Sequence, residues 1–153
     1  MNKLLYLIVP LVTWGLFTTS VLAKDLVNVS GASGIGLDGY DPVAFFIEKR
    51  PMNGDPAISA AYKGAKYFFT SKDHKIRFEE DPGKYVPQYG GYCAFGVALG
   101  ALFPVDINTW QIRNGKLYLN LNPAILELFN KDFEGQVANA EKNWPRLVKK
   151  YTK

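Results

Sequence analysis

The first 23 residues set the limits of the folding domain. A basic start at Lys3 precedes an almost uncharged, mostly apolar stretch from Leu4 to Leu22, which closes in the small-x-small pattern Val21-Leu22-Ala23. These features are typical of a secretory signal peptide that is cleaved after Ala23. The apolar stretch is also about long enough to span a bilayer, so an uncleaved membrane anchor is the alternative. We therefore expect a periplasmic or secreted protein whose residues 24–153 form one domain.

The charge pattern argues against one class of partner. The chain has a formal net charge of +4, spread along its length apart from a basic tail that contains Arg146, Lys149, Lys150 and Lys153. Nucleic-acid binding usually requires a clustered basic stripe, so we expect no nucleic-acid partner. Contact with a membrane is expected only through an uncleaved signal peptide. Because 48% of the residues are hydrophobic, a core can form without disulfides.

Local signals divide the rest of the chain into a flexible lead-in, residues 24–38, and one domain, residues 39–150, with a C-terminal helical extension. The predicted elements are a short strand or helical turn over Pro42–Ile47, a hairpin of Ile58–Tyr62 with Lys66–Thr70, helices over Lys72–Glu80 and Tyr92–Leu99, a hairpin of Thr109–Arg113 with Lys116–Leu121, and a helix that starts at Asn122-Pro123, breaks near Asp132–Gly135 and resumes to Asn143. This order predicts a small single α+β domain with short antiparallel hairpins and a C-terminal helical segment.

Two of these elements have strong boundary signals. Ser71 is a good N-cap for the helix over 72–80, and Asp81-Pro82 should end it, with Ile76 and Phe78 packed inward. Asn114-Gly115 supplies the positive φ angles of a type I′ turn, so it predicts a tight hairpin.

Cys93 is the only cysteine, in the stretch Gln88–Gly96. A lone thiol in an oxidising compartment can be a buried structural residue, half of an intermolecular disulfide, a metal ligand or a reactive thiolate. We expect it in the first turn of a helix after Gly90-Gly91, where free backbone amides stabilise a thiolate. Ala94 and the other small residues of that helix equally favour a packed, inert cysteine.

His74 and Asp41 are the other candidates for a site. His74 is the only histidine, and a lone histidine is more often hydrogen-bonded or solvated than a ligand. Asp41 is an oxygen donor held next to Pro42, although Asp-Pro is also ordinary turn chemistry. Together with Cys93, these residues could complete a three- or four-coordinate site for copper or zinc. No CxxC or HxxxH pair is present, so spacing alone supports this site weakly.

Several blocks, in order, resemble the exported YHS-domain (seleno)protein family. They are Gly39–Phe46, Tyr62–Ser71, His74 to Phe78, Asp81-Pro82, Lys84-Tyr85, Pro87–Ala94, Gly115–Asn120 and Asn143–Pro145. The resemblance covers nearly all of residues 24–153 and implies a small metal-associated module of the kind found with copper and heavy-metal transport proteins.

The resemblance also bears on individual residues. Metal-binding members of the wider YHS group place cysteines where this chain has Ala44 and Thr70, so only His74 carries over from them as a ligand. Some exported members use selenocysteine at the position of Cys93, which favours a ligating or reactive thiol over an inert one.

Three hypotheses follow. The first is a periplasmic protein that binds a soft or borderline metal, copper above all, through Cys93, His74 and Asp41. The second is a thiol-based redox protein that uses Cys93 as its nucleophile. The third is a noncatalytic module that binds a small ligand or a protein partner on an aromatic-rich surface. No Ser/His/Asp set, spaced carboxylate pair or phosphate loop is recognisable, so an enzyme is the less favoured outcome.

Overall fold

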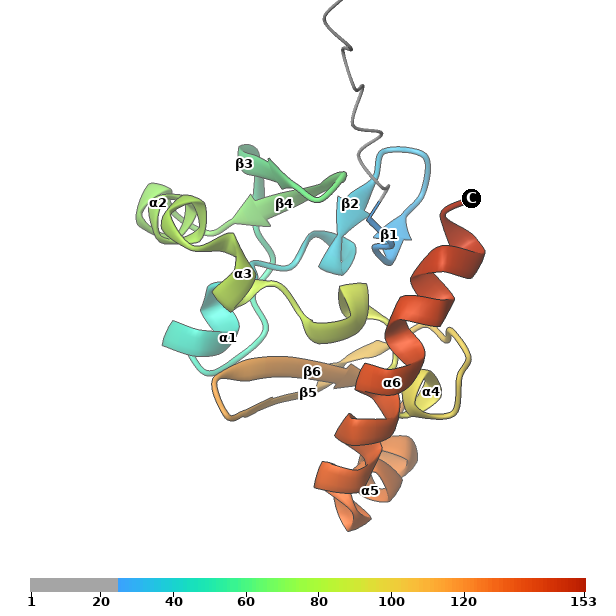
Figure 1. Ribbon diagram of the computed structural model, residues 1–153. Coiled ribbons are helices and arrows are strands. Elements are labelled where there is room, and N and C mark those ends of the chain that lie inside the picture. The colour runs from blue at the N-terminus through green and yellow to red at the C-terminus, as the bar shows by residue number, and fades with distance from the viewer. Residues whose placement is uncertain (1–24) are drawn as a thin grey trace, which may run out of the picture.

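The computed structural model describes residues 25–153, in which helices surround two small β-sheets (Figure 1). The predicted signal peptide and its cleavage site after Ala23 lie outside this range. The mixed α+β single-domain class predicted from the sequence is confirmed. Within residues 25–153, no helix is both long and apolar enough to cross a membrane.

The first sheet has four strands in the order β1 (Val29–Ser30), β2 (Ile35–Gly36), β4 (Ala65–Phe69) and β3 (Asp55–Tyr62). The antiparallel β3–β4 hairpin confirms the predicted pairing. In contrast, β1 and β2 lie in the segment expected to be a flexible lead-in, and β2 pairs in parallel with β4. Backbone pairing along the free edge of β4 outweighs the loop-like composition of this segment.

The second sheet is the hairpin of β5 (Asp106–Arg113) and β6 (Lys116–Asn120). Asn114 and Gly115 have φ angles of 52° and 71°, as the type I′ turn prediction requires. Successive residues of a strand point to opposite faces. Leu117 and Leu119 accordingly pack into a core cluster with the first sheet, while Tyr118 packs into a second cluster with the C-terminal helices. β6 therefore joins the two halves of the core.

Four short α-helices and two 3-10 turns connect these parts. They are η1 (Leu37–Gly39), α1 (Ala44–Ile47), α2 (Lys72–Glu80), α3 (Pro82–Tyr85), η2 (Gln88–Gly91) and α4 (Ala94–Ala98). The bounds of α2 and its Ser71 cap are as predicted, with Ser71 Oγ accepting from the His74 amide at 3.2 Å. The inward position predicted for Ile76 is wrong, because its side chain is 55% exposed. His74 and Phe78, one helical turn apart, form the buried face, and Ile76 lies midway between them on the other side.

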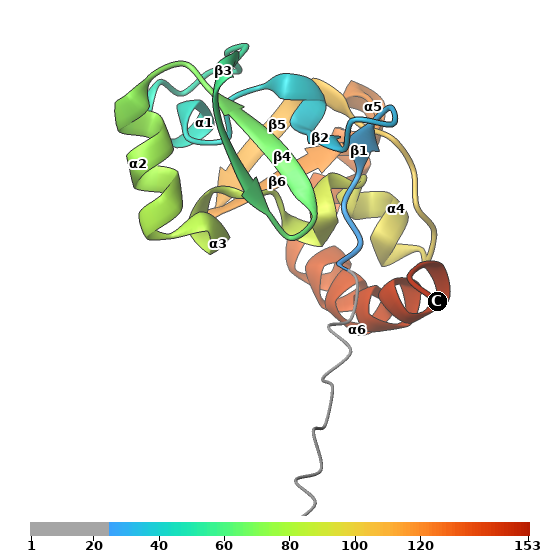
Figure 2. The same ribbon diagram turned by 90° about the horizontal axis from the view of Figure 1, so that it is seen from above.

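The C-terminal segment forms α5 (Pro123–Lys131) and α6 (Phe133–Tyr151), so the predicted break is confirmed. The predicted end at Asn143 is wrong, since α6 continues through Pro145. Proline within a helix costs about 3 kcal/mol. Buried contacts of Ala140 and Leu147 on either side offset this cost by holding both halves of α6 against the core. Figures 1 and 2 show α6 running along one side of the molecule, with α2 on the opposite side.

Candidate functional site

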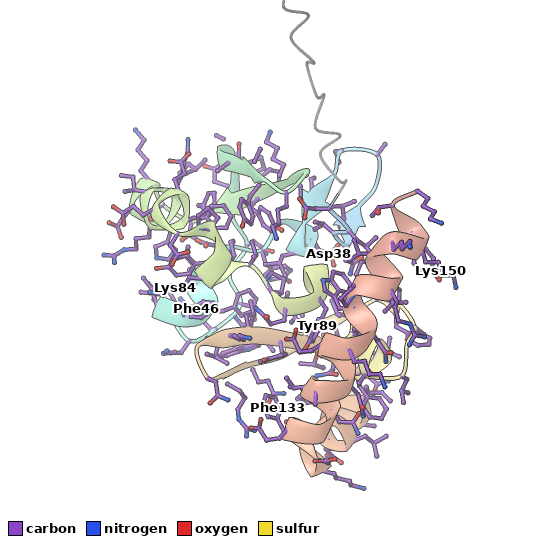
Figure 3. The ribbon with its side chains drawn as sticks, viewed as in Figure 1. Asp38, Phe46, Lys84, Tyr89, Phe133 and Lys150 are labelled. Carbon is purple, nitrogen blue, oxygen red and sulfur yellow. The ribbon has the colours of Figure 1, made fainter. Side chains whose placement is uncertain are left out.

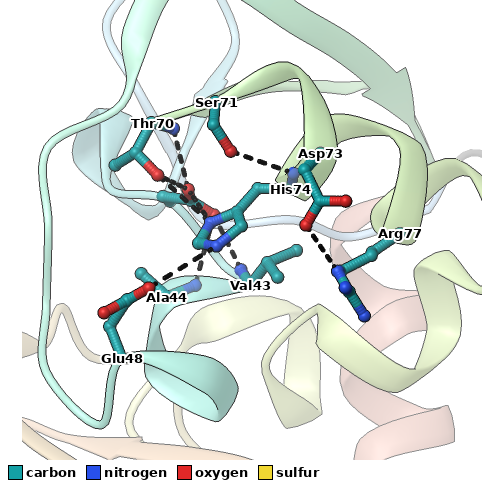
Figure 4. A network of polar contacts seen from close by, with 9 residues as sticks. Val43, Ala44, Glu48, Thr70, Ser71, Asp73, His74 and Arg77 are labelled. Carbon is teal, nitrogen blue, oxygen red and sulfur yellow. Dashed lines mark hydrogen bonds and ion pairs between the residues drawn. The ribbon is translucent and has the colours of Figure 1, made fainter.

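Asp41 lies at the centre of a buried polar cluster, because it accepts hydrogen bonds from residues of three segments. Figure 4 shows Val43, Thr70 and His74 of this cluster. Its side chain is 0% exposed. Oδ1 accepts hydrogen bonds from the amides of Val43 at 2.8 Å and Ala44 at 3.3 Å, which start α1. Oδ2 accepts from the amide and hydroxyl of Thr70, both at 2.8 Å, and from His74. A carboxylate offers about four lone-pair sites. Hydrogen bonds from the protein therefore occupy both carboxylate oxygens of Asp41, so neither is free to bind a metal ion.

Asp41 instead fixes the ring of His74. His74 Nδ1 lies 2.7 Å from Asp41 Oδ2, and the His74 residue is 6% exposed. Because the carboxylate can only accept, Nδ1 carries the proton and a neutral ring keeps its lone pair on Nε2. Nε2 faces Glu48 Oε1 at 3.9 Å, which is too long for a hydrogen bond. The Glu48 side chain is 43% exposed, so this corner of the cluster opens to solvent.

Cys93 is the N-cap of α4 and not, as expected, part of its first turn. Its Sγ accepts from the Gly96 amide at 3.4 Å and donates to Asn120 Oδ1 at 3.7 Å. The residue is 1% exposed. Asn120 Oδ1 also accepts from the Phe95 amide, so thiol and amide together hold the start of α4 against β6. These contacts are those of a structural cysteine.

The structure brings together two of the three predicted site residues. Asp41 and His74 are in contact, whereas Cys93 packs at the junction of α4 and β6. Figures 1 and 2 both place α2, which carries His74, and α4 on opposite sides of the molecule. The structure thus places Asp41 and His74 in one cluster and Cys93 in another part of the fold, and a metal site formed by these three residues stays a prediction from the sequence. Within residues 25–153, no three His, Cys, Asp or Glu side chains form a group suited to a metal.

A second location was not predicted from the sequence. A cleft of about 230 Å³ lies between the β3–β4 turn, the α3–η2 segment and α6, and Tyr62, Tyr67, Tyr89 and Trp144 line it. Figure 3 shows Tyr89 beside α6. Three of the segments that carry the family resemblance meet here. Tyrosines are frequent near these motifs, but their convergence depends on tertiary packing, so only the composition of the cleft could be anticipated from the sequence.

The path of the chain beside the cleft depends on one glycine. Gly90 has a φ of +61°, and a Cβ at this position would collide with the carbonyl of Leu26. The Asn28 amide donates to the Gly90 carbonyl at 2.8 Å, and the Asn28 side chain donates to the Gly91 carbonyl at 3.1 Å. Glycine therefore lets residues 26–28 pack directly on η2, where Leu26 and Val27 line the cleft.

Three of the polar side chains of the cleft are phenols, those of Tyr62, Tyr67 and Tyr89. Burial, and secondarily the neighbouring Tyr62, raises the pKa of Tyr67 far above its ordinary value. Burial, followed by the nearby Glu141 carboxylate, does the same to the pKa of Tyr89. Both hydroxyls thus stay protonated at neutral pH. The Tyr89 hydroxyl donates to Glu141 Oε1 at 3.4 Å.

The chain matches no protein-family model, no curated protein and no solved structure in the comparisons made. The resemblance to the YHS-domain family therefore remains a prediction from the sequence.

Proposed function

We propose that this chain is a small exported binding protein whose aromatic cleft takes a small organic ligand. The observation that carries the proposal is the convergence of Tyr62, Tyr67, Tyr89 and Trp144 on one cleft. Ligand sites in proteins are typically concave, largely apolar or aromatic, and contain a few polar groups that fix orientation.

The composition of this cleft fits that description. Its aromatic rings supply apolar contact area, and its hydroxyls and the Glu141 carboxylate supply polar contacts. Tyr67 is 2% exposed and lines the cleft, and its hydroxyl is not among the fully buried side-chain groups that lack a hydrogen-bond partner. A ligand with a polar group can pair with this hydroxyl at the cleft surface.

A fragment screen by NMR on isotope-labelled protein, produced from the full-length chain, tests the proposal. We expect ligands that shift the Trp144 indole resonance and those of neighbouring cleft residues. A Gly83→Leu variant should reduce their binding, because Gly83 lines the cleft and a Cβ there has room beside the Tyr62 hydroxyl. Glu79→Leu, on the exposed part of α2, is the control. A screen in which ligands shift only resonances elsewhere would overturn the proposal.

A metal site is the second candidate, favoured by the hydrogen bond that orients His74. Histidine ligands of metals commonly donate their other ring N–H to a carboxylate, as His74 does to Asp41. The donors available are then His74 Nε2 and Glu48 Oε1, 3.9 Å apart. Nitrogen and oxygen donors suit Zn²⁺ or Cu²⁺ better than the soft Cu⁺. Two protein ligands leave the remaining positions to water.

Titration of the protein with Zn²⁺ and Cu²⁺ by calorimetry separates this site from the one first expected. Glu48→Gln should weaken binding without disturbing the Asp41–His74 hydrogen bond. Cys93→Ser should bind the metal as the unsubstituted protein does. Binding that is lost in Cys93→Ser and kept in Glu48→Gln would instead implicate the thiol.

A further inference from the structure

We infer that the aromatic cleft selects an organic cation, such as a small quaternary ammonium compound. This inference rests on the proposed ligand-binding function and specifies its ligand class. It is carried by the charges and rings that line the cleft.

The charged groups of the cleft leave one carboxylate uncompensated. Among residues 25–153, three charged residues line it, Asp25, Lys63 and Glu141. Lys63 Nζ lies 3.8 Å from Asp25 Oδ1, and both side chains are about half exposed, at 51% and 47%. These two charges offset each other at the rim. Within residues 25–153, Glu141 forms no ion pair, and its nearest polar contact is the Tyr89 hydroxyl. The charged residues that line the cleft within residues 25–153 therefore sum to one negative charge.

The aromatic rings next to Glu141 also favour a positively charged ligand. Tyr89 and Trp144 have centroids 5.9 Å apart and planes inclined at 63°, so they form two walls of a corner. Glu141 precedes Trp144 by three residues on α6, and residues three apart lie on the same face of a helix. The faces of aromatic rings attract cations, and tryptophan does so most strongly. Rings and carboxylate thus favour the same kind of ligand.

The neutral phenols complete the site. The Tyr67 and Tyr89 hydroxyls are protonated at neutral pH, so they present dipoles and not competing charges. The volume of about 230 Å³ is below the about 300–1,000 Å³ of typical pockets for drug-sized ligands, so the cleft suits a small cation. An anion would meet the Glu141 carboxylate, and the cation that could offset this repulsion, Lys63, is already paired with Asp25.

Calorimetric titration with choline and with 3,3-dimethylbutan-1-ol, its uncharged isostere, tests the inference. We expect choline to bind about tenfold or more tightly, because cation–π and charge attraction are absent from the alcohol. Glu141→Gln should weaken choline binding about fivefold or more and leave the alcohol unchanged. Glu127→Gln, an exposed carboxylate on α5, is the matched control and should change neither titration.

The outcomes distinguish this inference from the proposed function. Equal binding of choline and the alcohol, or choline binding unchanged in Glu141→Gln, would overturn the cation preference and leave the cleft a ligand site. The same holds if neither compound binds while the fragment screen finds neutral or anionic ligands in the cleft. A screen without ligands in the cleft would overturn both.

Discussion

His74 donates a 2.7 Å hydrogen bond to the buried carboxylate of Asp41, which lies 33 residues earlier in the chain. Through this carboxylate the start of α1, the end of β4 and the first turn of α2 are held together. The Asp41-Pro42 turn and the segment from Thr70 to His74 are thus parts of one polar cluster. Any metal bound by His74 would depend on this support.

Replacement of Asp41 should therefore destabilise the fold strongly. Asp41→Ala leaves the buried donors of Thr70 and His74 without their acceptor, and each buried donor left unpaired costs about 1–3 kcal/mol. Urea denaturation followed by circular dichroism measures the loss. Asp73→Asn removes an exposed carboxylate that contacts Arg77 on the same helix, and should leave the midpoint nearly unchanged. Equal effects of the two substitutions would contradict a structural role for Asp41.

The local parts of the fold could be predicted from the sequence. Ser71, Asn114-Gly115 and Asn122-Pro123 fix their helix starts and their turn through contacts within a few residues, so pattern and capping chemistry were sufficient. The prediction for the end of α6 failed because the helix passes Pro145 only with the support of distant core contacts.

In the candidate site, too, local features could be predicted from the sequence and contacts between distant segments could not. Asp41, His74 and Cys93 were selected by residue type, and type alone does not bring residues together. Asp41 contacts His74 because Thr70, at the end of β4, and the following helix α2 lie beside the Asp41-Pro42 turn. Cys93 comes shortly after η2 in the chain and lies at the end of β6, where its thiol donates a hydrogen bond to Asn120 Oδ1. The aromatic cleft needs three distant segments at once, so no local pattern contains it.

The position of Cys93 predicts a thiol of low reactivity. Its Sγ is buried and hydrogen-bonded at the start of α4, whereas fast alkylation requires an accessible thiolate. We expect iodoacetamide to modify Cys93 fully in the unfolded protein and very slowly in the folded one, as followed by mass spectrometry. Rapid, pH-dependent modification of the folded protein would support the thiol-redox hypothesis instead.

The signal-peptide prediction has a direct test. The intact mass of protein recovered after expression of the full-length chain should match residues 24–153, because cleavage is expected after Ala23. Ala23→Arg should block cleavage, since the peptidase requires a small residue at this position, and should leave the larger species in the membrane fraction. A full-length mass for the unsubstituted protein would favour the uncleaved anchor.

The buried phenols of the cleft predict a loss of stability in alkaline solution. Burial raises the pKa values of Tyr67 and Tyr89, so in the folded protein both stay protonated when an unfolded tyrosine, with a pKa of about 10, begins to ionise. Above that pH the unfolded state binds fewer protons than the folded state, and the free energy of unfolding falls as pH rises. Below about pH 9 the two tyrosines should contribute no pH dependence.

Urea midpoints measured between about pH 8 and about pH 11 would show this decline. Tyr67→Phe should make it shallower, because one ionisable phenol is removed while the ring that packs over Gly36 is kept. Tyr151→Phe, at the half-exposed end of α6, should leave the slope unchanged. If Tyr67→Phe and Tyr151→Phe alter the slope equally, burial does not raise the pKa of Tyr67, and its hydroxyl is not shielded in the cleft wall.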